Sequence, residues 1–370
     1  MTSPATGSHS AVPTASSPRL EIYLFDCGHG DTILVKLPDD RWGMIDCYLP
    51  KGSVRNRFLA FLAAKNIHTF EFVFQTHPHY DHFHGMEAVL EGLISKGQKI
   101  RRYYDHGLNA QIVAHLMNGN PGTPEYVALH KRLEEWADNG SIERWVPLTA
   151  ERYPVEIPVG GCLINFVPLA PLPDDHRRIV TSDLRKLTAK PTAVAAANAL
   201  SLVVALTASA GAESFNALLG ADAEVDSLAK SLSCWQNHCA RYSCRQTFDV
   251  IKVPHHGSKH SHHSPVCGTK PAGIAAVAAI SAGTREALPD RKVIEAYLNA
   301  DWTVMCTTTR NRPVSATSLP MTLSSRAAPP IAPPTQTVEF TWEPVLGLGI
   351  APPSSYITTT DLPNYATAKK

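Results

Sequence analysis

The chain has 370 residues, of which 44% are hydrophobic, so it can bury one large core or two smaller ones. Its formal net charge is only +1, which argues against a tight nonspecific DNA-binding protein but is compatible with an enzyme that has a local cationic cleft. The eight cysteines lack the spacing of a small disulfide-rich secreted domain, so we expect reduced thiols and a cytoplasmic location.

The beginning of the chain predicts a disordered leader followed by an antiparallel meander. Residues 1–18 are mostly Ala, Ser, Thr and Pro, without the basic start and apolar stretch of a signal peptide. From residue 20 to residue 47, strand-like runs alternate with tight turns whose glycines permit sharp bends. We expect the aspartates at the strand ends to accept turn hydrogen bonds rather than to bind a metal directly; these are Asp26, Asp31 and Asp46.

Residues 76–85 read Thr-His-Pro-His-Tyr-Asp-His-Phe-His-Gly and follow the apolar run 72–74. Because that run is rich in strand formers, the ligand-type side chains should lie on a loop at the end of a strand. A loop lets neighbouring side chains point at two centres, and imidazole and carboxylate groups are ligands of Zn²⁺ and related ions. The alternative is a His-rich surface turn, but four ligand-type residues at this spacing favour a metal site: His77, His79, Asp81 and His82. His84 is expected to support the site or face solvent.

The uncharged segment 191–212 is long enough to cross a membrane. Polar residues interrupt it, however, and no basic flank is biased to one side. A buried pair of strands at 200–207 and 215–219, joined by a turn at 209–214, explains the same residues. We therefore expect no membrane association.

Three short motifs follow along the chain. They are Asn198-Ala-Leu-Ser201, Gly220-Ala-Asp222 and Lys252-Val-Pro-His255-His256-Gly257-Ser258. Each alone is a weak signal, because a single Asp or a pair of His is more often structural. Further on, the pattern predicts a strand at 275–280, a helix at 293–298 and a closing strand at 302–307.

Together these motifs resemble the metallo-β-lactamase superfamily, whose signature is His-x-His-x-Asp-His followed by Gly. Here the signature is matched by His77, His79, Asp81, His82 and Gly85. The later motifs, and the turn at 26–31, are similar to those of the ComEC-like branch, although Cys27 and His29 replace Val and Gln and Ala221 replaces Gly. The resemblance covers about residues 20–310. It implies an α/β αββα sandwich, with two mixed sheets flanked by helices, and only the soluble catalytic domain of that branch.

The resemblance also implies a division of the ligands between two metal ions. His77 and His79 would bind one ion, Asp81 and His82 would bind the other, and Asp222 would bridge them. His255 would be the last metal-binding histidine, whereas His256 would face the substrate as a proton donor. Ser258 and Asn198 are expected at the substrate. The middle histidine that the superfamily often has is missing, and its candidates are His176, His106 and Asn198.

The implied function is that of a metal-dependent hydrolase with catalytic Asp81, Asp222 and His256. Two Zn²⁺ ions, or Mn²⁺ in their place, would supply a metal-bound hydroxide that attacks a phosphodiester. This predicts a phosphodiesterase or nuclease acting on a nucleic acid or a nucleotide. The alternatives are hydrolysis of another bond, such as a β-lactam, thioester or phosphorylcholine ester, or a catalytically inactive metal-binding subunit of a multiprotein system such as one used in bacterial defence.

We expect a hydrolase domain at 19–324 with an insertion around 226–246, then a Pro-rich tail at 325–370 in which 338–342 could add an edge strand. Cys234, Cys239 and Cys244 with His238 could hold a structural Zn²⁺, but free thiols are favoured because the spacing is unusual for zinc. Two further sets remain open. His260, His262 and His263 form either a solvated turn or a cationic rim, and a phosphate-binding cleft could be lined by Arg101, Arg102, Arg177, Arg178 and Arg185.

Overall fold

The computed structural model describes residues 19–117, 120–150, 154–159, 161–179, 181, 197–211, 213–282, 288–307, 338–343, 347–350 and 356–357. The predicted leader, most of the predicted tail and Arg185 lie outside the described residues.

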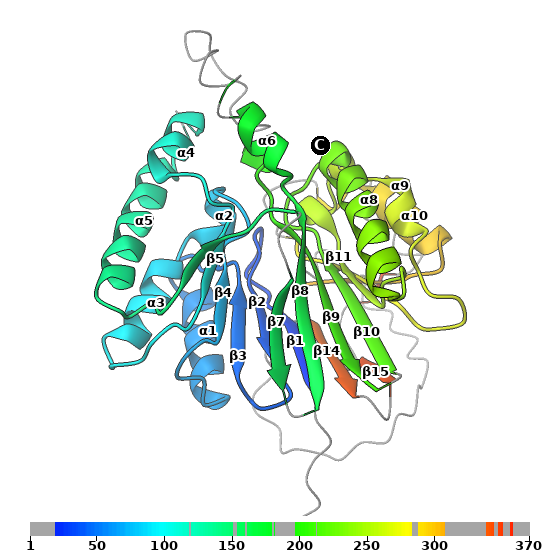
Figure 1. The fold of residues 1–370 in the computed structure, drawn as a ribbon, viewed down its shortest axis with the longest axis horizontal. Helices are drawn as coiled ribbons and strands as arrows, with labels where there is room; N and C mark the ends of the chain where they lie inside the picture. The colour runs from blue at the N-terminus through cyan, green and yellow to red at the C-terminus, as the bar shows by residue number, and fades with distance from the viewer. Residues whose placement is uncertain are drawn as a thin grey trace, which may run out of the picture.

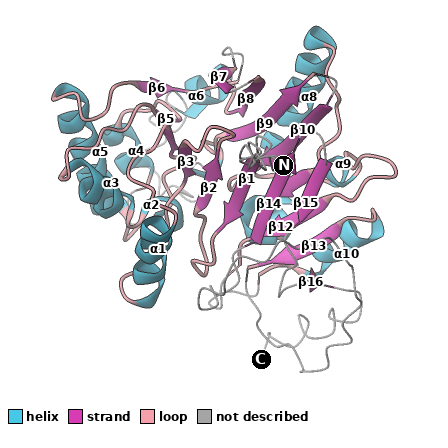
Figure 2. Ribbon diagram, turned by 90° about the horizontal axis from the view of Figure 1, so that it is seen from below, coloured by secondary structure: helices cyan, strands magenta, loops and turns pink. Residues whose placement is uncertain are grey.

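In this part of the chain, two eight-stranded mixed sheets face each other and helices cover their outer faces (Figures 1 and 2). The predicted α/β sandwich of two mixed sheets flanked by helices is confirmed. The first sheet has the order β15-β14-β1-β2-β3-β4-β5-β6 and the second the order β16-β13-β12-β11-β10-β9-β8-β7.

The strands of the first sheet are β1 (Leu20–Leu24), β2 (Ile33–Lys36), β3 (Trp42–Ile45), β4 (Phe72–Phe74), β5 (Tyr103–Asp105), β6 (Trp145–Pro147), β14 (Val338–Glu343) and β15 (Gly347–Ile350). Strands β1, β2 and β3 form the predicted antiparallel meander, and β3 to β6 are parallel. Strand β14 lies between β1 and β15, so the prediction of an edge strand at 338–342 is wrong in its position: a strand forms there, but β15 covers its other side.

The strands of the second sheet are β7 (Val155–Val159), β8 (Cys162–Ala170), β9 (Val203–Ala210), β10 (Glu213–Leu219), β11 (Val250–Lys252), β12 (Val277–Ile280), β13 (Thr303–Cys306) and β16 (Tyr356–Ile357). The predicted strand pair is confirmed, because β9 and β10 form an antiparallel hairpin. Among the described residues, no helix is both long and apolar enough to cross a bilayer. Strands β10 to β13 are parallel, so their carboxyl ends gather at one edge of the sheet.

Helices α1 (Ser53–Ala64), α3 (Met86–Ile94), α4 (Ala110–Leu116) and α5 (Thr123–Asp138) lie outside the first sheet, and α8 (Val225–Tyr242), α9 (Ser264–Cys267) and α10 (Arg291–Asn299) lie outside the second (Figure 1). The short helices α2 (Tyr80–Phe83) and α6 (Pro173–Arg178) follow strand ends. The predicted helix at 293–298 is therefore confirmed as part of α10.

Period-two alternation explains how one strand serves two cores. In β2, Ile33 and Val35 face the second sheet and join the central core with Phe74 and Phe166, whereas Leu34 faces α1 and packs near Phe58 in the outer core. On the other side, α8 packs Leu228, Leu232 and Trp235 against the second sheet. The segment expected as an insertion is thus mainly a helix that contributes to the core.

The cysteines near the end of α8 do not form a metal site in the described part of the chain, where every potential metal group consists of His and Asp. Instead the Sγ atoms of Cys239 and Cys244 lie 2.9 Å apart, because the chain turns back after the left-handed residue Ser243. Both thiols are reduced in this structure, as is that of Cys234.

Because their sulfurs are already adjacent, Cys239 and Cys244 should form a disulfide under mild oxidation. Hydrogen peroxide would accept the two electrons and be reduced to water while the two thiols lose their hydrogens. Peptide mapping by mass spectrometry should find the cross-link in wild-type protein and in Cys234→Ser, but not in Cys244→Ser. A cross-link to Cys234 in the wild-type protein would contradict this pairing.

Candidate metal centre

Three loops that leave parallel strands meet at one end of the sandwich. The 76–85 loop follows β4 in the first sheet, whereas Asp222 follows β10 and the His255–His256 pair follows β11 in the second. Backbone hydrogen bonds hold the loops together: Leu202 N donates to Thr76 O at 2.8 Å, and His255 N donates to Ala221 O at 2.8 Å. The site is therefore built from both sheets.

Asp222 lies at the centre of the site and is only 2% exposed. Its Oδ2 atom is 3.6 Å from His77 Nε2 and 3.8 Å from His255 Nε2. Its Oδ1 atom is 3.3 Å from His82 Nε2 and 3.6 Å from His256 Nε2. One carboxylate thus presents each oxygen to a different pair of imidazoles, which is the arrangement of a ligand that bridges two cations.

The ligand-type atoms form two groups that share this carboxylate. Within each group they all lie within 4.8 Å of one another; one group is His77, His79 and Asp222, and the other is Asp81, His82, Asp222 and His256. Several of these atoms are buried without a hydrogen-bond partner in the described structure: Nε2 of His77, His82 and His256, and Oδ1 of Asp222. An unpaired buried polar atom costs about 1–3 kcal/mol, so these residues fit divalent cations, which would satisfy all of them together.

The adjacent residues His255 and His256 point to different groups because both have left-handed backbone conformations, with φ values of 49° and 53°. His255 Nε2 faces the oxygen of Asp222 that His77 also faces. His256 Nε2 faces the other oxygen and lies 3.3 Å from Asp81 Oδ2. A left-handed backbone conformation is costly for residues other than glycine, and such strain concentrates at functional sites.

Hydrogen bonds from the outer side of the site fix the ring orientations. His82 Nδ1 lies 2.7 Å from Asp46 Oδ2, and Asp46 also accepts from Thr76 N. His256 Nδ1 lies 2.9 Å from the carbonyl oxygen of Ser281, which can only accept, so Nδ1 carries a hydrogen and Nε2 is the nitrogen that faces Asp222 and Asp81. We expected His256 to face the substrate, but the structure places it in the group with Asp81, His82 and Asp222.

Asp31 and Asp46 could form a third group with His82, but their oxygens already have partners. Asp31, which is 1% exposed, forms an ion pair with the buried Lys252 and accepts a hydrogen bond from Ser281 Oγ. Both carboxylates therefore contact residues of the site from its outer side, and not the local turn hydrogen bonds that we expected of strand-end aspartates.

Electrostatics separates the histidines into two kinds. Burial holds the pKa of His77, His79 and His255 below the usual histidine value, so these imidazoles are neutral at pH 7. Burial also disfavours the charged form of His82, but Asp222 and Asp46 outweigh it and raise its pKa well above the usual value. The pKa of His256 is raised as well, because Asp222 and Asp81 outweigh the effect of burial. A metal cation bound by the group that contains His82 and His256 would supply the positive charge that protons on these imidazoles otherwise provide.

The candidates for the missing middle histidine lie elsewhere. His106 Nε2 is 3.1 Å from the hydroxyl of Tyr126, and His176 is part of α6. Asn198 is buried, and its Nδ2 donates to Glu224 Oε1. The imidazole that lies beside the same Asp222 oxygen as His77 is that of His255, which we expected as the last metal-binding histidine.

Other predicted residues lie at the edge of the site or outside it. His84 Nδ1 is 2.7 Å from Glu125 and its ring stacks on Tyr80, so it faces away from the cluster. Ser258 Oγ accepts a hydrogen bond from His260 N, which stabilises the turn that follows. Of the later histidines, His260 is exposed.

The sequence analysis assigned no role in the site to His29, Lys252 or Ser281. His29 Nε2 lies 3.6 Å from Asp81 Oδ2, and its ring centroid is 4.5 Å from that of His256. In the sequence, His29 could have been singled out by its place in the Gly-rich turn before Asp31. Lys252 could have been singled out as a charged residue within an apolar strand. Ser281 carried no local signal.

The sequence matches no protein-family model and no curated protein. Among solved structures, the chain is similar to the metallo-β-lactamase fold protein YhfI from Bacillus subtilis, with 10% identity, a TM-score of 0.40, and coverage of 78% of this chain and 96% of that chain. It is also similar to a diphosphatase from the PhnP family, with 11% identity, a TM-score of 0.32, and coverage of 68% and 82%. A third is the metallo-β-lactamase GOB-18 from Elizabethkingia meningoseptica, with 9% identity, a TM-score of 0.31, and coverage of 81% and 96%. Such low values do not carry an activity from those proteins to this one.

Proposed function

We propose that this chain is a two-metal hydrolase of the metallo-β-lactamase type that cleaves phosphodiester bonds, as a nuclease or a phosphodiesterase. One observation carries the two-metal part of the proposal. The buried carboxylate of Asp222 presents its two oxygens to two separate pairs of imidazoles, and three of the four facing nitrogens, Nε2 of His77, His82 and His256, are buried without a hydrogen-bond partner. Two Zn²⁺ ions fit this donor set, and Mn²⁺ is the alternative.

Each residue then has a stated role. His77, His79 and His255 would hold one ion, and Asp81, His82 and His256 would hold the other, with Asp222 shared. Cations bound there would supply an activated water at neutral pH and neutralise the charge that develops on the substrate. Asp46 and Ser281 keep the hydrogens of His82 and His256 on the outer nitrogens, which leaves the inner ones available.

The phosphodiester part of the proposal rests on the ComEC-like order of motifs, from 198–201 through 220–222 to 252–258. A cytoplasmic location, a nucleic acid or nucleotide as substrate, and Ser258 and Asn198 as substrate contacts are part of the same proposal.

The test is a substrate screen with metal-loaded protein. Single-stranded DNA, double-stranded DNA, RNA, cyclic dinucleotides and bis-p-nitrophenyl phosphate should include at least one substrate whose cleavage stops after chelation and in Asp81→Ala. Hydrolysis of a β-lactam or a thioester, with all phosphodiesters intact, would replace the proposal by another hydrolase. Binding of metal without any cleavage would identify an inactive metal-binding subunit.

The assignment of His255 and His256 to different metal ions gives a separate prediction. His255→Ala and His256→Ala should each lower the metal content from two ions per chain toward one, because each removes a ligand from a different group. His84→Ala, which alters a histidine outside the cluster, should keep both ions. Metal analysis after gel filtration measures the stoichiometry. Full metal content in His255→Ala would show that His255 is not a ligand.

A further inference from the structure

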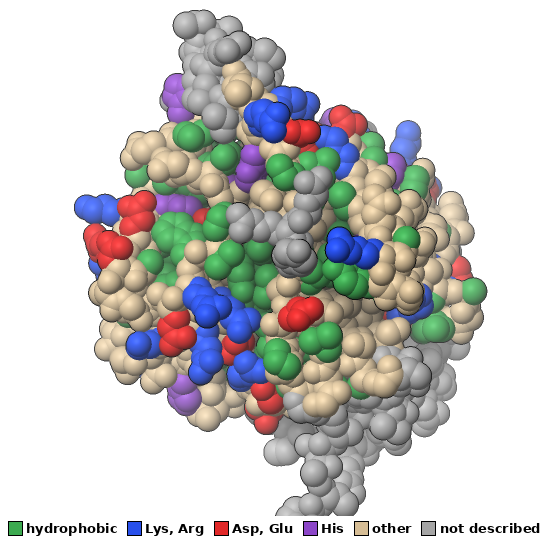
Figure 3. All heavy atoms as spheres, in the orientation of Figure 1, with side chains coloured by type: hydrophobic (Ala, Val, Ile, Leu, Met, Phe, Trp, Pro, Cys, Tyr) green, Lys and Arg blue, Asp and Glu red, His purple; other side chains and the backbone are tan. Residues whose placement is uncertain are grey.

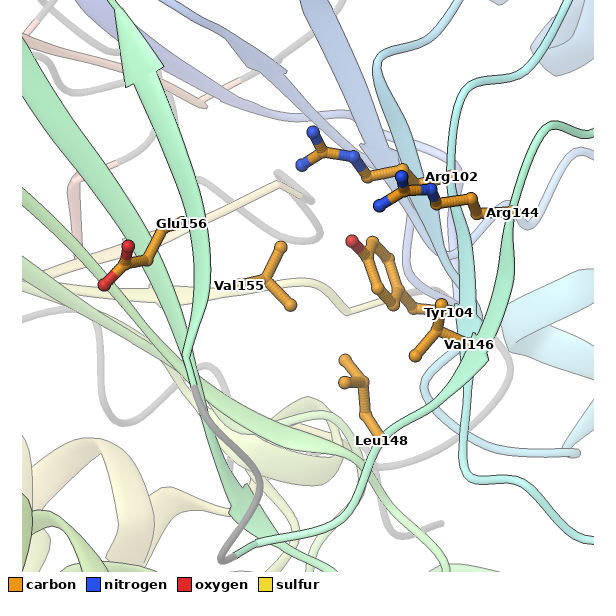
Figure 4. Close-up of a pocket in the computed structure, with 7 residues that line it drawn as sticks. All are labelled: Arg102, Tyr104, Arg144, Val146, Leu148, Val155 and Glu156. Carbon is orange, nitrogen blue, oxygen red and sulfur yellow. The ribbon is translucent and has the colours of Figure 1, made fainter.

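A cavity with a volume of about 360 Å³ opens between the two sheets at the edge where β6 and β7 lie (Figure 4). Its lining combines cationic, aromatic and aliphatic side chains from both sheets: Arg102, Tyr104, Arg144, Val146, Leu148, Val155 and Glu156. None of these residues belongs to the metal centre. The face of the molecule seen in Figure 3 carries apolar side chains in its middle with a group of Lys and Arg side chains beside them.

Strand alternation explains why two arginines reach this cavity. Arg102 and Tyr104 are two residues apart, as are Arg144 and Val146, so each pair lies on one face of the first sheet. That face is the inner one, because Tyr104 belongs to the central core and stacks on Phe74. The inner face of a sandwich is ordinarily apolar. Arg102 is half-buried and Arg144 is exposed, so both guanidinium groups can reach a ligand that enters at the open edge of the sheets.

The available carboxylates supply too little negative charge for these arginines. Glu71, whose side chain is 1% exposed, is shared by Arg41, Arg101 and Arg102, at distances of 3.0, 3.7 and 3.6 Å. Arg41 has a second partner in Asp39 at 2.6 Å, but Arg101 and Arg102 share Glu71. Arg144 forms no ion pair with an acidic residue in the described part of the chain. The carboxylate of Glu156 points away from both guanidinium groups (Figure 4).

Arg102 and Arg144 are also neighbours across the parallel pair β5–β6, because each directly precedes a residue of the paired positions Tyr103 and Trp145. Like charges on neighbouring strands destabilise a sheet. Both guanidinium groups lie on the same side of the cavity, above the hydroxyl of Tyr104 (Figure 4). An anion placed between them would relieve the repulsion and accept hydrogen bonds from both guanidinium groups.

We propose that this cavity binds an organic phosphomonoester, with the phosphate between Arg102 and Arg144 and the apolar substituent against Val146, Leu148 and Val155. Two guanidinium groups match the double charge and the oxygen geometry of a phosphate monoester. The aliphatic walls offer contact to an apolar substituent that an inorganic ion lacks, and the volume lies within the usual range for small-molecule sites, about 300–1,000 Å³. The proposal does not depend on the reaction at the metal centre.

Isothermal titration calorimetry with phenyl phosphate tests this site in the full chain, both metal-loaded and after chelation. We expect a saturable site that is present in both forms and so survives chelation, because no metal ligand lines the cavity; binding at the metal centre would be lost on chelation. Inorganic phosphate, which lacks the apolar part, and benzoate, which has a single charge, should each bind several times more weakly.

Arg144→Ala should weaken phenyl phosphate binding about tenfold or more, since a hydrogen bond to a charged group is worth about 1.5–3 kcal/mol. Arg101→Ala is the matched control, because it removes the same charge from the neighbouring strand but does not line the cavity; its effect should stay below about threefold. The proposal is overturned by an absence of saturable binding, by loss of the site on chelation, by equal losses in the two variants, or by inorganic phosphate or benzoate binding as tightly as phenyl phosphate.

Discussion

Asp222→Asn is expected to abolish hydrolysis and to disable both metal positions at once. The amide has nearly the shape of the carboxylate but carries no charge and offers one oxygen, whereas the structure uses both oxygens of Asp222. Loss of a shared ligand should therefore reduce turnover by at least about a hundredfold, more than the effect of losing an outer hydrogen-bond partner.

Thermal unfolding during a metal titration separates this effect from misfolding. Wild-type protein should gain about 2.7 kcal/mol in unfolding free energy for each metal site when the free metal is a hundred times the dissociation constant of that site. Asp222→Asn should lose most of that gain. The control is Asp105→Asn, a buried carboxylate whose hydrogen-bond partners are Gly107 N and Trp145 Nε1 and not members of the cluster. An Asp222→Asn protein that keeps the full metal-dependent gain would refute the bridging role.

The second large effect is expected for Lys252→Met. Lys252 is 3% exposed and pairs with Asp31, which is 1% exposed. Burial disfavours the charged lysine, but Asp31 and Asp222 outweigh it and raise the pKa of Lys252 above its usual value. Removal of the lysine leaves the carboxylate of Asp31 buried without its cation, at a cost of about 3–5 kcal/mol in unfolding free energy.

Denaturant unfolding of the metal-free proteins at pH 7 measures this loss. The pKa of Lys252 is higher in the folded protein than in the unfolded chain. The stability that the ion pair contributes is therefore fully present below the usual lysine pKa and is lost only as pH rises through the pKa of the folded protein. Neutral pH thus lies where the pair is intact. The double variant Lys252→Met/Asp31→Asn should recover much of the loss, since it removes both charges. Lys270→Met, at an ion pair with the 93% exposed Asp301, should cost at most about 1 kcal/mol. A single variant as stable as wild type would contradict this account.

The sequence predicted those features that depend on local pattern. The strands β4, β9 and β10 follow from apolar runs, and the ligand spacing at 77–82 is contained in one loop. The sandwich itself came from the resemblance, because no local pattern says which strands face each other.

The features that were missed depend on backbone conformation and on long-range packing. Nothing in the letters His-His shows that both residues adopt left-handed conformations and diverge. Ser281 reaches His256 and Asp31 only after the two sheets have packed. Arg101 and Arg102 were considered for a phosphate-binding cleft of unspecified position, and they lie at the amino end of β5, whereas the metal loops lie at the carboxyl ends of their strands. Arg177 and Arg178 lie in α6, where each pairs with a neighbouring aspartate.

The origin of the ligands in opposite sheets has a consequence for how the protein assembles. His77, His79, Asp81 and His82 come from the first sheet, and Asp222, His255 and His256 come from the second. A fragment that ends near residue 150 would hold only the first set, and a fragment that begins near residue 154 would hold only the second. Mixing two such fragments should restore tight metal uptake only when their inner faces meet, so the ions would act as reporters of correct docking between the two halves.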